Sequence, residues 1–98
     1  VIPCNASGTN TISLTPLDSS PLIEGYVDHE VYVFAAAATS TGDVTMNVVT
    51  RSGALSTVKA YKTGGSAQAS TGDVVSGSLY LAVYNDALDG GNGGFVLK

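Results

Sequence analysis

The chain has 98 residues, a length that provides one hydrophobic core and therefore a single domain over residues 1–98. Charged residues make up only 12% of it, and 4 Lys and Arg against 8 Asp and Glu give a net charge of -4. This acidic balance argues against a phosphate-binding surface, so we expect no nucleic-acid partner. Because no apolar run reaches the roughly 20 residues of a membrane span, we expect no membrane partner either.

Runs rich in Val and Thr predict β-strands along the whole chain, because β-branched side chains suit a pleated surface. In chain order, the predicted strands are residues 11–15, 30–36, 44–48, 56–62, 78–84 and 95–97. Pro16 and Pro21 bracket a polar connection after the first strand. The alanine run 35–38 is too short to nucleate a helix, so we expect a strand that runs into a turn. Short strands separated by glycine turns predict an all-β fold, either a small antiparallel β-sandwich or a barrel-like module.

The pentapeptide Ser-Thr-Gly-Asp-Val occurs twice, at residues 40–44 and 70–74. We interpret it as a shared turn, in which Gly takes a positive φ and Asp bonds to the neighbouring backbone. A duplicated half-domain is the alternative, although the flanking sequences do not match.

Two predicted strands, around residues 31–34 and 79–84, are apolar on both faces. A strand in a single layer is normally polar on its outer side, so we expect a second copy of the chain to cover one face. Scattered exposure of aromatic rings is the alternative. The predicted core residues are Val31, Val33, Met46, Val48, Val58, Leu81 and Val83. The predicted interface residues are Tyr32, Phe34, Tyr80 and Tyr84.

The sequence offers little that could carry catalysis, since it contains one His and one Cys. His29 lies between Asp28 and Glu30, but on an extended segment it points away from both. Acid–base catalysis needs closer partners, and zinc needs clustered His and Cys ligands. We therefore expect no enzyme activity, no metal and no cofactor, and we expect Cys4 to be a small buried apolar side chain.

The segment 85–94 combines oxygen-bearing side chains with glycines and is the longest predicted loop. It lacks the spacing of a calcium-binding loop. We predict a flexible surface loop whose exposed polar residues are Asn85, Asp86, Asp89 and Asn92.

Five stretches, taken in order, resemble a small β module found in virion proteins of tailed bacteriophages. Residues 2–16 read IPCNASGTNTISLTP, and residues 31–45 read VYVFAAAATSTGDVT. The other stretches are the Tyr26-Val27-Asp28 step and residues 53–62 and 72–97. The sequence departs from the pattern at His29 and in the stretch around Arg51.

This resemblance implies a non-enzymatic structural protein of the virion, a homotrimeric β module that projects from the head or tail like a fibre. Its partners would be other copies of itself, other virion proteins such as the major capsid or tail proteins, and the host surface. One alternative is a capsid decoration (cement) protein that bridges neighbouring capsomers. A complete product of 98 residues would favour decoration, and a fragment of a longer chain would favour a fibre. A third possibility, a carbohydrate-binding β module, requires a deep pocket lined by Tyr26, Tyr61 and Tyr84.

Overall fold

The computed structural model describes residues 1–17 and 25–98, so the predicted role of Pro21 lies outside the described residues. The strands are β1 (Ile2–Ser7), β2 (Thr11–Pro16), β3 (Val31–Ala35), β4 (Thr45–Thr50), β5 (Gly53–Ala54), β6 (Val58–Tyr61), β7 (Leu79–Asn85) and β8 (Gly94–Leu97). A 3₁₀ turn at Asp89–Gly91 precedes β8 and is the only helical element among the described residues. The all-β prediction is therefore confirmed.

Within the described residues, seven strands close into a barrel in the order β2-β1-β3-β7-β8-β6-β4, and β4 pairs back with β2. The ladders β1–β2, β3–β7, β7–β8 and β4–β6 are antiparallel. The ladders β1–β3, β2–β4 and β6–β8 are parallel, so the barrel is mixed and not purely antiparallel. Each parallel pair is separated in the chain by one further strand, which provides the crossover that parallel pairing requires.

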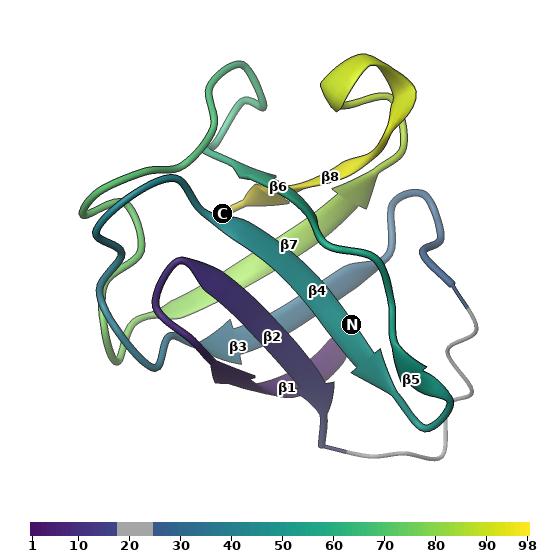
Figure 1. Ribbon diagram of the computed structural model, residues 1–98, viewed down its shortest axis with the longest axis horizontal. Coiled ribbons are helices and arrows are strands. Elements are labelled where there is room, and N and C mark those ends of the chain that lie inside the picture. The colour runs from purple at the N-terminus through teal and green to yellow at the C-terminus, as the bar shows by residue number, and fades with distance from the viewer. Residues whose placement is uncertain (18–24) are drawn as a thin grey trace.

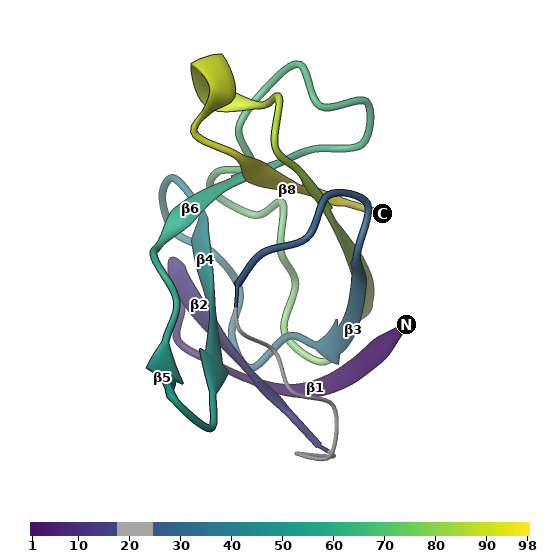
Figure 2. The same ribbon diagram turned by 90° about the vertical axis from the view of Figure 1, so that its right-hand side faces the viewer.

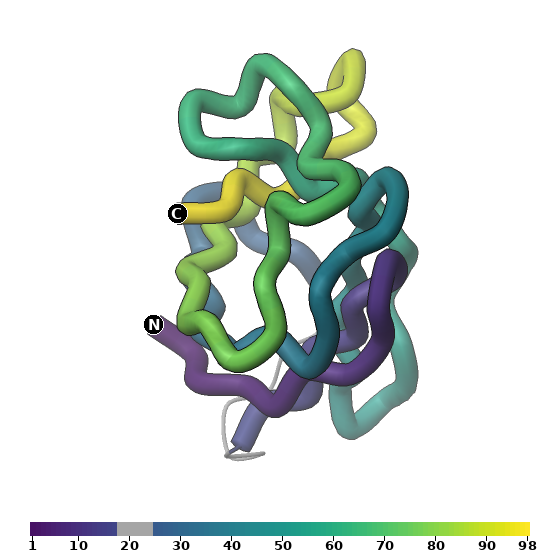
Figure 3. Tube along the Cα trace, turned by 90° about the vertical axis from the view of Figure 1, so that its left-hand side faces the viewer, coloured from purple at the N-terminus to yellow at the C-terminus, as the bar shows by residue number. Residues whose placement is uncertain are grey.

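The barrel is flattened, with overall dimensions of 33 × 30 × 19 Å. Figure 1 shows β2 and β4 crossing in front of β3 and β7, and Figure 2 shows the same two walls from the side. We call β2, β4 and β6 the β2–β4 wall, and β3 and β7 the β3–β7 wall; β1 and β8 connect the two. Both ends of the chain lie on the side of the β3–β7 wall (Figure 2), and the tube in Figure 3 shows them close to the same edge.

Aliphatic side chains from the β2–β4 wall meet aromatic rings from β3, β7 and β8 in the interior. The buried side chains from the β2–β4 wall include Ile12, Leu14, Met46 and Val48. The rings of Tyr32 and Phe95 pack edge to face with centroids 5.6 Å apart. A buried ring removes about 150–250 Å² from water, so a few rings account for much of this small core.

The core prediction is correct on the β2–β4 wall and wrong on β3 and β7. The predicted core residues that are buried are Met46, Val48 and Val58. The predicted core residues that point outward are Val31, Val33, Leu81 and Val83. The inner positions of β3 are taken by Tyr32 and Phe34, each 1% exposed. The alternation of a strand separates two faces without saying which is inside, and here the larger rings fill the interior.

The sequence patterns do not predict β1 or β5. In β1, Pro3 and Asn5 interrupt the apolar pattern, although the strand pairs with both β2 and β3. The strand β5 has only two residues and pairs with the end of β4 as a short hairpin. Both strands depend on pairing with distant or adjacent segments, which local composition does not reveal.

Candidate functional site

The outer surface of the β3–β7 wall is apolar. We call it the apolar face, and it consists of the outward residues Pro3, Val31, Val33, Leu79, Leu81, Val83 and Val96. The strand register places them side by side, because Val33 lies opposite both Pro3 and Leu81. In the adjacent row, Val83 lies opposite both Val31 and Val96. Leu79 is 74% exposed and Leu81 is 39% exposed.

The strands that carry the apolar face, β1, β3, β7 and β8, contain no charged residue. Charged residues continue the ladders just beyond these strands: Lys98 exchanges paired main-chain hydrogen bonds with Leu81, and the Glu30 main-chain oxygen accepts one from the Tyr84 amide.

The outer surface of the β2–β4 wall is polar at the equivalent ladder positions. The hydroxyl groups of Thr11 and Thr45 lie 3.1 Å apart, and Ser13 Oγ donates a hydrogen bond to Asn47 Oδ1 at 2.8 Å. The outer surfaces of the two walls therefore differ in chemistry, one being apolar and the other polar. A continuous exposed apolar surface of this kind is characteristic of a contact site.

The predicted aromatic interface is wrong for Tyr32, Phe34 and Tyr84. Their rings are 1%, 1% and 7% exposed and lie inside the barrel, where they cannot reach another molecule. Burial raises the pKa of the Tyr32 hydroxyl to about 12, and the nearby Glu30 carboxylate adds to this shift. Tyr80 is partly buried, and its hydroxyl accepts a hydrogen bond from the Val75 amide at 2.8 Å. The expectation of a strand with two apolar faces stands, but the aliphatic face is the outer one.

The predicted loop residues separate into two groups. Asp89 and Asn92 line a pocket of about 460 Å³ against the start of β6. Asn85 and Asp86 instead hold the chain locally: Asn85 Oδ1 accepts a hydrogen bond from the Ala87 amide, and the Asp86 amide donates to Asp28 Oδ1. A 3₁₀ turn and its main-chain hydrogen bonds shape part of this loop, and its flexibility stays a prediction.

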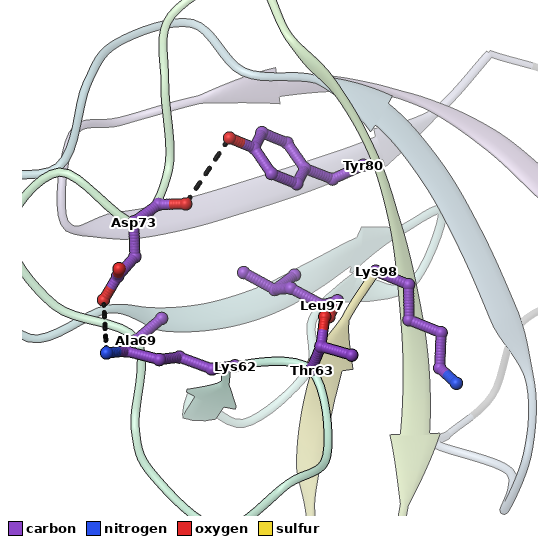
Figure 4. Close-up of a pocket in the computed structure, with 7 residues that line it drawn as sticks. All are labelled: Lys62, Thr63, Ala69, Asp73, Tyr80, Leu97 and Lys98. Atoms are coloured by element: carbon purple, nitrogen blue, oxygen red, sulfur yellow. Dashed lines mark hydrogen bonds and ion pairs between the residues drawn. The ribbon is translucent and has the colours of Figure 1, made fainter.

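A second pocket, of about 270 Å³, lies between β7, the end of β8 and the loop after β6 (Figure 4). Its rim contains an ion pair in which Lys62 Nζ lies 3.5 Å from Asp73 Oδ2. The Tyr80 hydroxyl donates a 3.4 Å hydrogen bond to the main-chain oxygen of Asp73. Lys98 extends away from this pair in Figure 4, so the two ammonium groups do not converge on one ligand position. The polar groups of Lys62, Asp73 and Tyr80 are therefore already bonded to one another.

The Asp28–His29 pair forms differently from the prediction. The chain turns here instead of running extended, with a φ of 70° at His29, and the Glu30 amide bonds to the Val27 oxygen. This turn brings His29 Nε2 to 3.3 Å from Asp28 Oδ2. The His29 side chain is 80% exposed, so the pair lies on the surface, outside both pockets.

Cys4 is buried in the core, as predicted, and its thiol donates a weak 3.5 Å contact to the Ile2 oxygen. Burial raises the pKa of this thiol to about 11, so it stays protonated at neutral pH. Among residues 1–17 and 25–98, no cluster of His, Cys, Asp and Glu has the arrangement of a metal site. In the same part of the chain, no helix is both long and apolar enough to cross a membrane.

The three tyrosines named for a sugar pocket do not line either of these pockets. Tyr26 and Tyr84 stack on each other with ring centroids 4.7 Å apart and an interplanar angle of 13°. Phe95 packs edge to face against both rings, so the stack is part of the core.

Comparison of the chain with protein families, curated proteins and solved structures finds no match. The resemblance to phage virion modules therefore stays a prediction.

Proposed function

We propose that this chain is a non-enzymatic structural module of a tailed-bacteriophage virion, which assembles as a homotrimer by packing its apolar face against other copies of itself. The observation that supports this most is the contrast between the two walls. The β3–β7 wall exposes Leu79 and Leu81 beside partly exposed aliphatic neighbours, while the β2–β4 wall exposes the hydrogen-bonded hydroxyl groups of Thr11 and Thr45.

The size of the apolar face suits the centre of an interface. The face spans four strands spaced about 4.8 Å apart. Each strand contributes about five residues, with a rise of about 3.3 Å per residue, so the face covers on the order of 300 Å². The largest apolar patch on a typical monomer has about this area and is often functional. A standard interface takes about 800 Å² from each partner, about a sixth of the 4871 Å² surface of this chain. The apolar face would form its core, with neighbouring polar residues as the rim.

The apolar face allows acidic copies of the chain to associate without bringing carboxylate side chains together. Three copies at -4 each carry a total charge of -12, which opposes assembly through any acidic surface. The apolar face brings no carboxylate into the contact, because its strands contain none. The strands of the apolar face lie inside the closed barrel ladder and have no free edge, so contact through this face packs side chain against side chain.

The trimeric state and the virion location rest on the sequence resemblance. A decoration protein would use the same face differently, by placing it on a capsomer. The two functions therefore differ in whether the isolated chain self-associates.

The test is the mass of the purified chain, measured by light scattering over a range of micromolar concentrations. We expect a trimer for the parent and a monomer for Leu81→Asp, because the introduced carboxylate would have to be buried at the contact. Thr15→Asp is the matched control, since it adds the same charge to an exposed outward position of β2, on the other wall. It should remain a trimer.

A parent chain that stays monomeric at high micromolar concentration would overturn the self-assembly proposal. If that monomer bound isolated capsid shells and the Leu81→Asp variant did not, the chain would be a capsid decoration protein instead of a self-assembling module. Loss of assembly in both variants would show that added charge alone dissociates the trimer, and the apolar face would lose its assigned role.

A further inference from the structure

The pocket beside the 3₁₀ turn lies on the β2–β4 wall, away from the apolar face. It is formed by the Asp89–Gly91 turn and the following residues on one side, and by the start of β6 on the other. In Figure 2 the turn and β6 lie on the same side of the barrel, opposite β3. Assembly through the apolar face would therefore leave this pocket open.

The charges in the pocket cancel. Lys59 Nζ lies 3.2 Å from Asp89 Oδ1, and these are the charged side chains among its lining residues. The pair joins segments 30 residues apart in the chain. A pocket with one cation and one anion in contact has little net attraction for a charged ligand, and a single carboxylate is too few for a metal ion.

The rest of the lining is mostly neutral and polar. Its hydroxyl and amide side chains are Thr45, Ser56, Thr57 and Asn92. Within the described residues, the side chains of Ser56, Thr57 and Asn92 make no hydrogen bond to other protein groups, so their donors and acceptors are available. Each of these groups can both donate and accept. Val58 and Gly93 complete the lining, and the pocket surface is about evenly divided between polar and apolar atoms.

The loop that forms one wall of the pocket, residues 88–93, has its conformation before any ligand binds. Asp89 has a φ of 53°, and Gly90, Gly91 and Gly93 also have positive φ. The amides of Gly91 and Gly93 both bond to the Leu88 oxygen, at 3.1 and 3.0 Å. A Cβ on Gly93 would overlap the Tyr84 hydroxyl, so glycine is what lets the loop lie against the barrel. A pre-formed wall lowers the entropy cost of binding.

We propose that this pocket binds a neutral polyhydroxylated ligand, such as a single sugar unit. The ligand hydroxyls would exchange hydrogen bonds with Ser56, Thr57 and Asn92, and the Lys59–Asp89 pair would offer one donor and one acceptor to adjacent hydroxyls. The volume of about 460 Å³ falls within the range of small-molecule sites. No aromatic ring lines the pocket, so binding depends on hydrogen bonds, and we expect dissociation constants of about 1 mM or weaker.

The test is a titration of the isotope-labelled chain, followed by amide chemical shifts, with glucose, galactose and N-acetylglucosamine in separate experiments. We expect saturable shifts at residues 56–59 and 88–93 for at least one sugar. Thr57→Ala and Asn92→Ala should each weaken that binding about two- to tenfold, the effect of one lost hydrogen bond. Both side chains are exposed, so the fold should persist. Thr71→Ala, an exposed threonine on a different loop, is the control and should bind like the parent.

The proposal fails if none of the three sugars shifts these amides at tens of millimolar. It also fails if the double variant Thr57→Ala/Asn92→Ala binds as well as the parent. Tighter binding of inorganic phosphate than of any sugar would overturn the assignment to a neutral ligand. The titration is repeated on Leu81→Asp, which should bind equally well, so the result does not depend on whether the chain assembles.

Discussion

Ser40 Oγ donates a hydrogen bond to the main-chain oxygen of Ser70 at 2.7 Å, and so joins the two occurrences of the Ser-Thr-Gly-Asp-Val pentapeptide. The same Oγ accepts from the Val74 amide at 3.2 Å, and the Ser40 amide donates to the Val74 oxygen at 2.9 Å. Ser40 is 1% exposed. One buried hydroxyl therefore connects two segments that follow different strands.

The two pentapeptides do not share one turn. Gly72 has a φ of 79°, and Asp73 Oδ2 accepts a hydrogen bond from the Ser70 amide at 2.8 Å, as predicted for the motif. Gly42 has no positive φ, and its amide bonds to Asn10 Oδ1 instead of to its own Asp. The shared-turn prediction is correct for residues 70–74 and wrong for residues 40–44, because Asn10 supplies the acceptor there.

Replacing Ser40 with alanine should lower the stability of the barrel more than a serine-to-alanine substitution usually does. Ser40→Ala leaves the Ser70 oxygen and the Val74 amide without this partner in the interior, where an unsatisfied group costs about 1–3 kcal/mol. We expect a loss of about 2–4 kcal/mol in the free energy of unfolding, measured by urea denaturation. Ser66→Ala, an exposed serine, is the control and should change it by less than about 0.5 kcal/mol. Equal stabilities for the two variants would contradict the assigned role of the hydroxyl.

Adjacent residues of β3 should differ sharply in their effect on stability. Phe34→Ala removes a ring that is 1% exposed and leaves a cavity, so we expect a loss of about 3–5 kcal/mol. Val33→Ala shortens a side chain on the outer surface and should cost about 1 kcal/mol or less. Both are measured by denaturation at low protein concentration, so that self-association does not add to stability. A larger effect at Val33 would mean that the wrong face of β3 has been placed inside.

Alanine at Gly93 should be tolerated less well than alanine at Gly91. Both glycines have positive φ, 87° and 97°, so both variants incur a similar backbone strain of about 1–2 kcal/mol. The added Cβ meets only open space at Gly91, whereas at Gly93 it overlaps the Tyr84 hydroxyl. The difference in melting temperature between Gly93→Ala and Gly91→Ala therefore isolates the contact between the loop and the barrel. Identical melting temperatures would show that the loop does not press on Tyr84.

Asp73 should make part of the stability depend on pH. The Ser70 amide holds the pKa of this carboxyl below its ordinary value of 3.8, and the Lys62 ammonium group lowers it further. A carboxyl with a lowered pKa stabilises the folded state above its unfolded pKa, and this contribution disappears as the pH falls through the folded value.

The stability of the parent should therefore drop more steeply below pH 3.8 than that of Asp73→Asn, as measured by urea denaturation at several acidic pH values. Asp43→Asn, the equivalent position of the other pentapeptide, is the control, because its side chain is exposed and makes no hydrogen bond to the described residues. Parallel pH profiles for the parent and Asp73→Asn would contradict the prediction.

The sequence by itself determined six of the eight strands of the described residues. Alternation and turn residues placed β2, β3, β4, β6, β7 and β8 close to their observed bounds, because side-chain period and glycine positions act locally. It also showed that β3 and β7 are apolar on both faces. The local pattern does not predict which face of such a strand is buried, since either face satisfies the alternation.

Tertiary structure decided which face is inside, and what meets across the barrel. Closure with β4 on β2 created an interior that rings such as Phe34 and Phe95 fill, which turned Val33 and Leu81 outward. The pairing of Lys59 with Asp89, 30 residues apart, likewise follows from the parallel ladder of β6 and β8. Such contacts depend on how distant strands pair, and chain-local propensity contains no information about that choice.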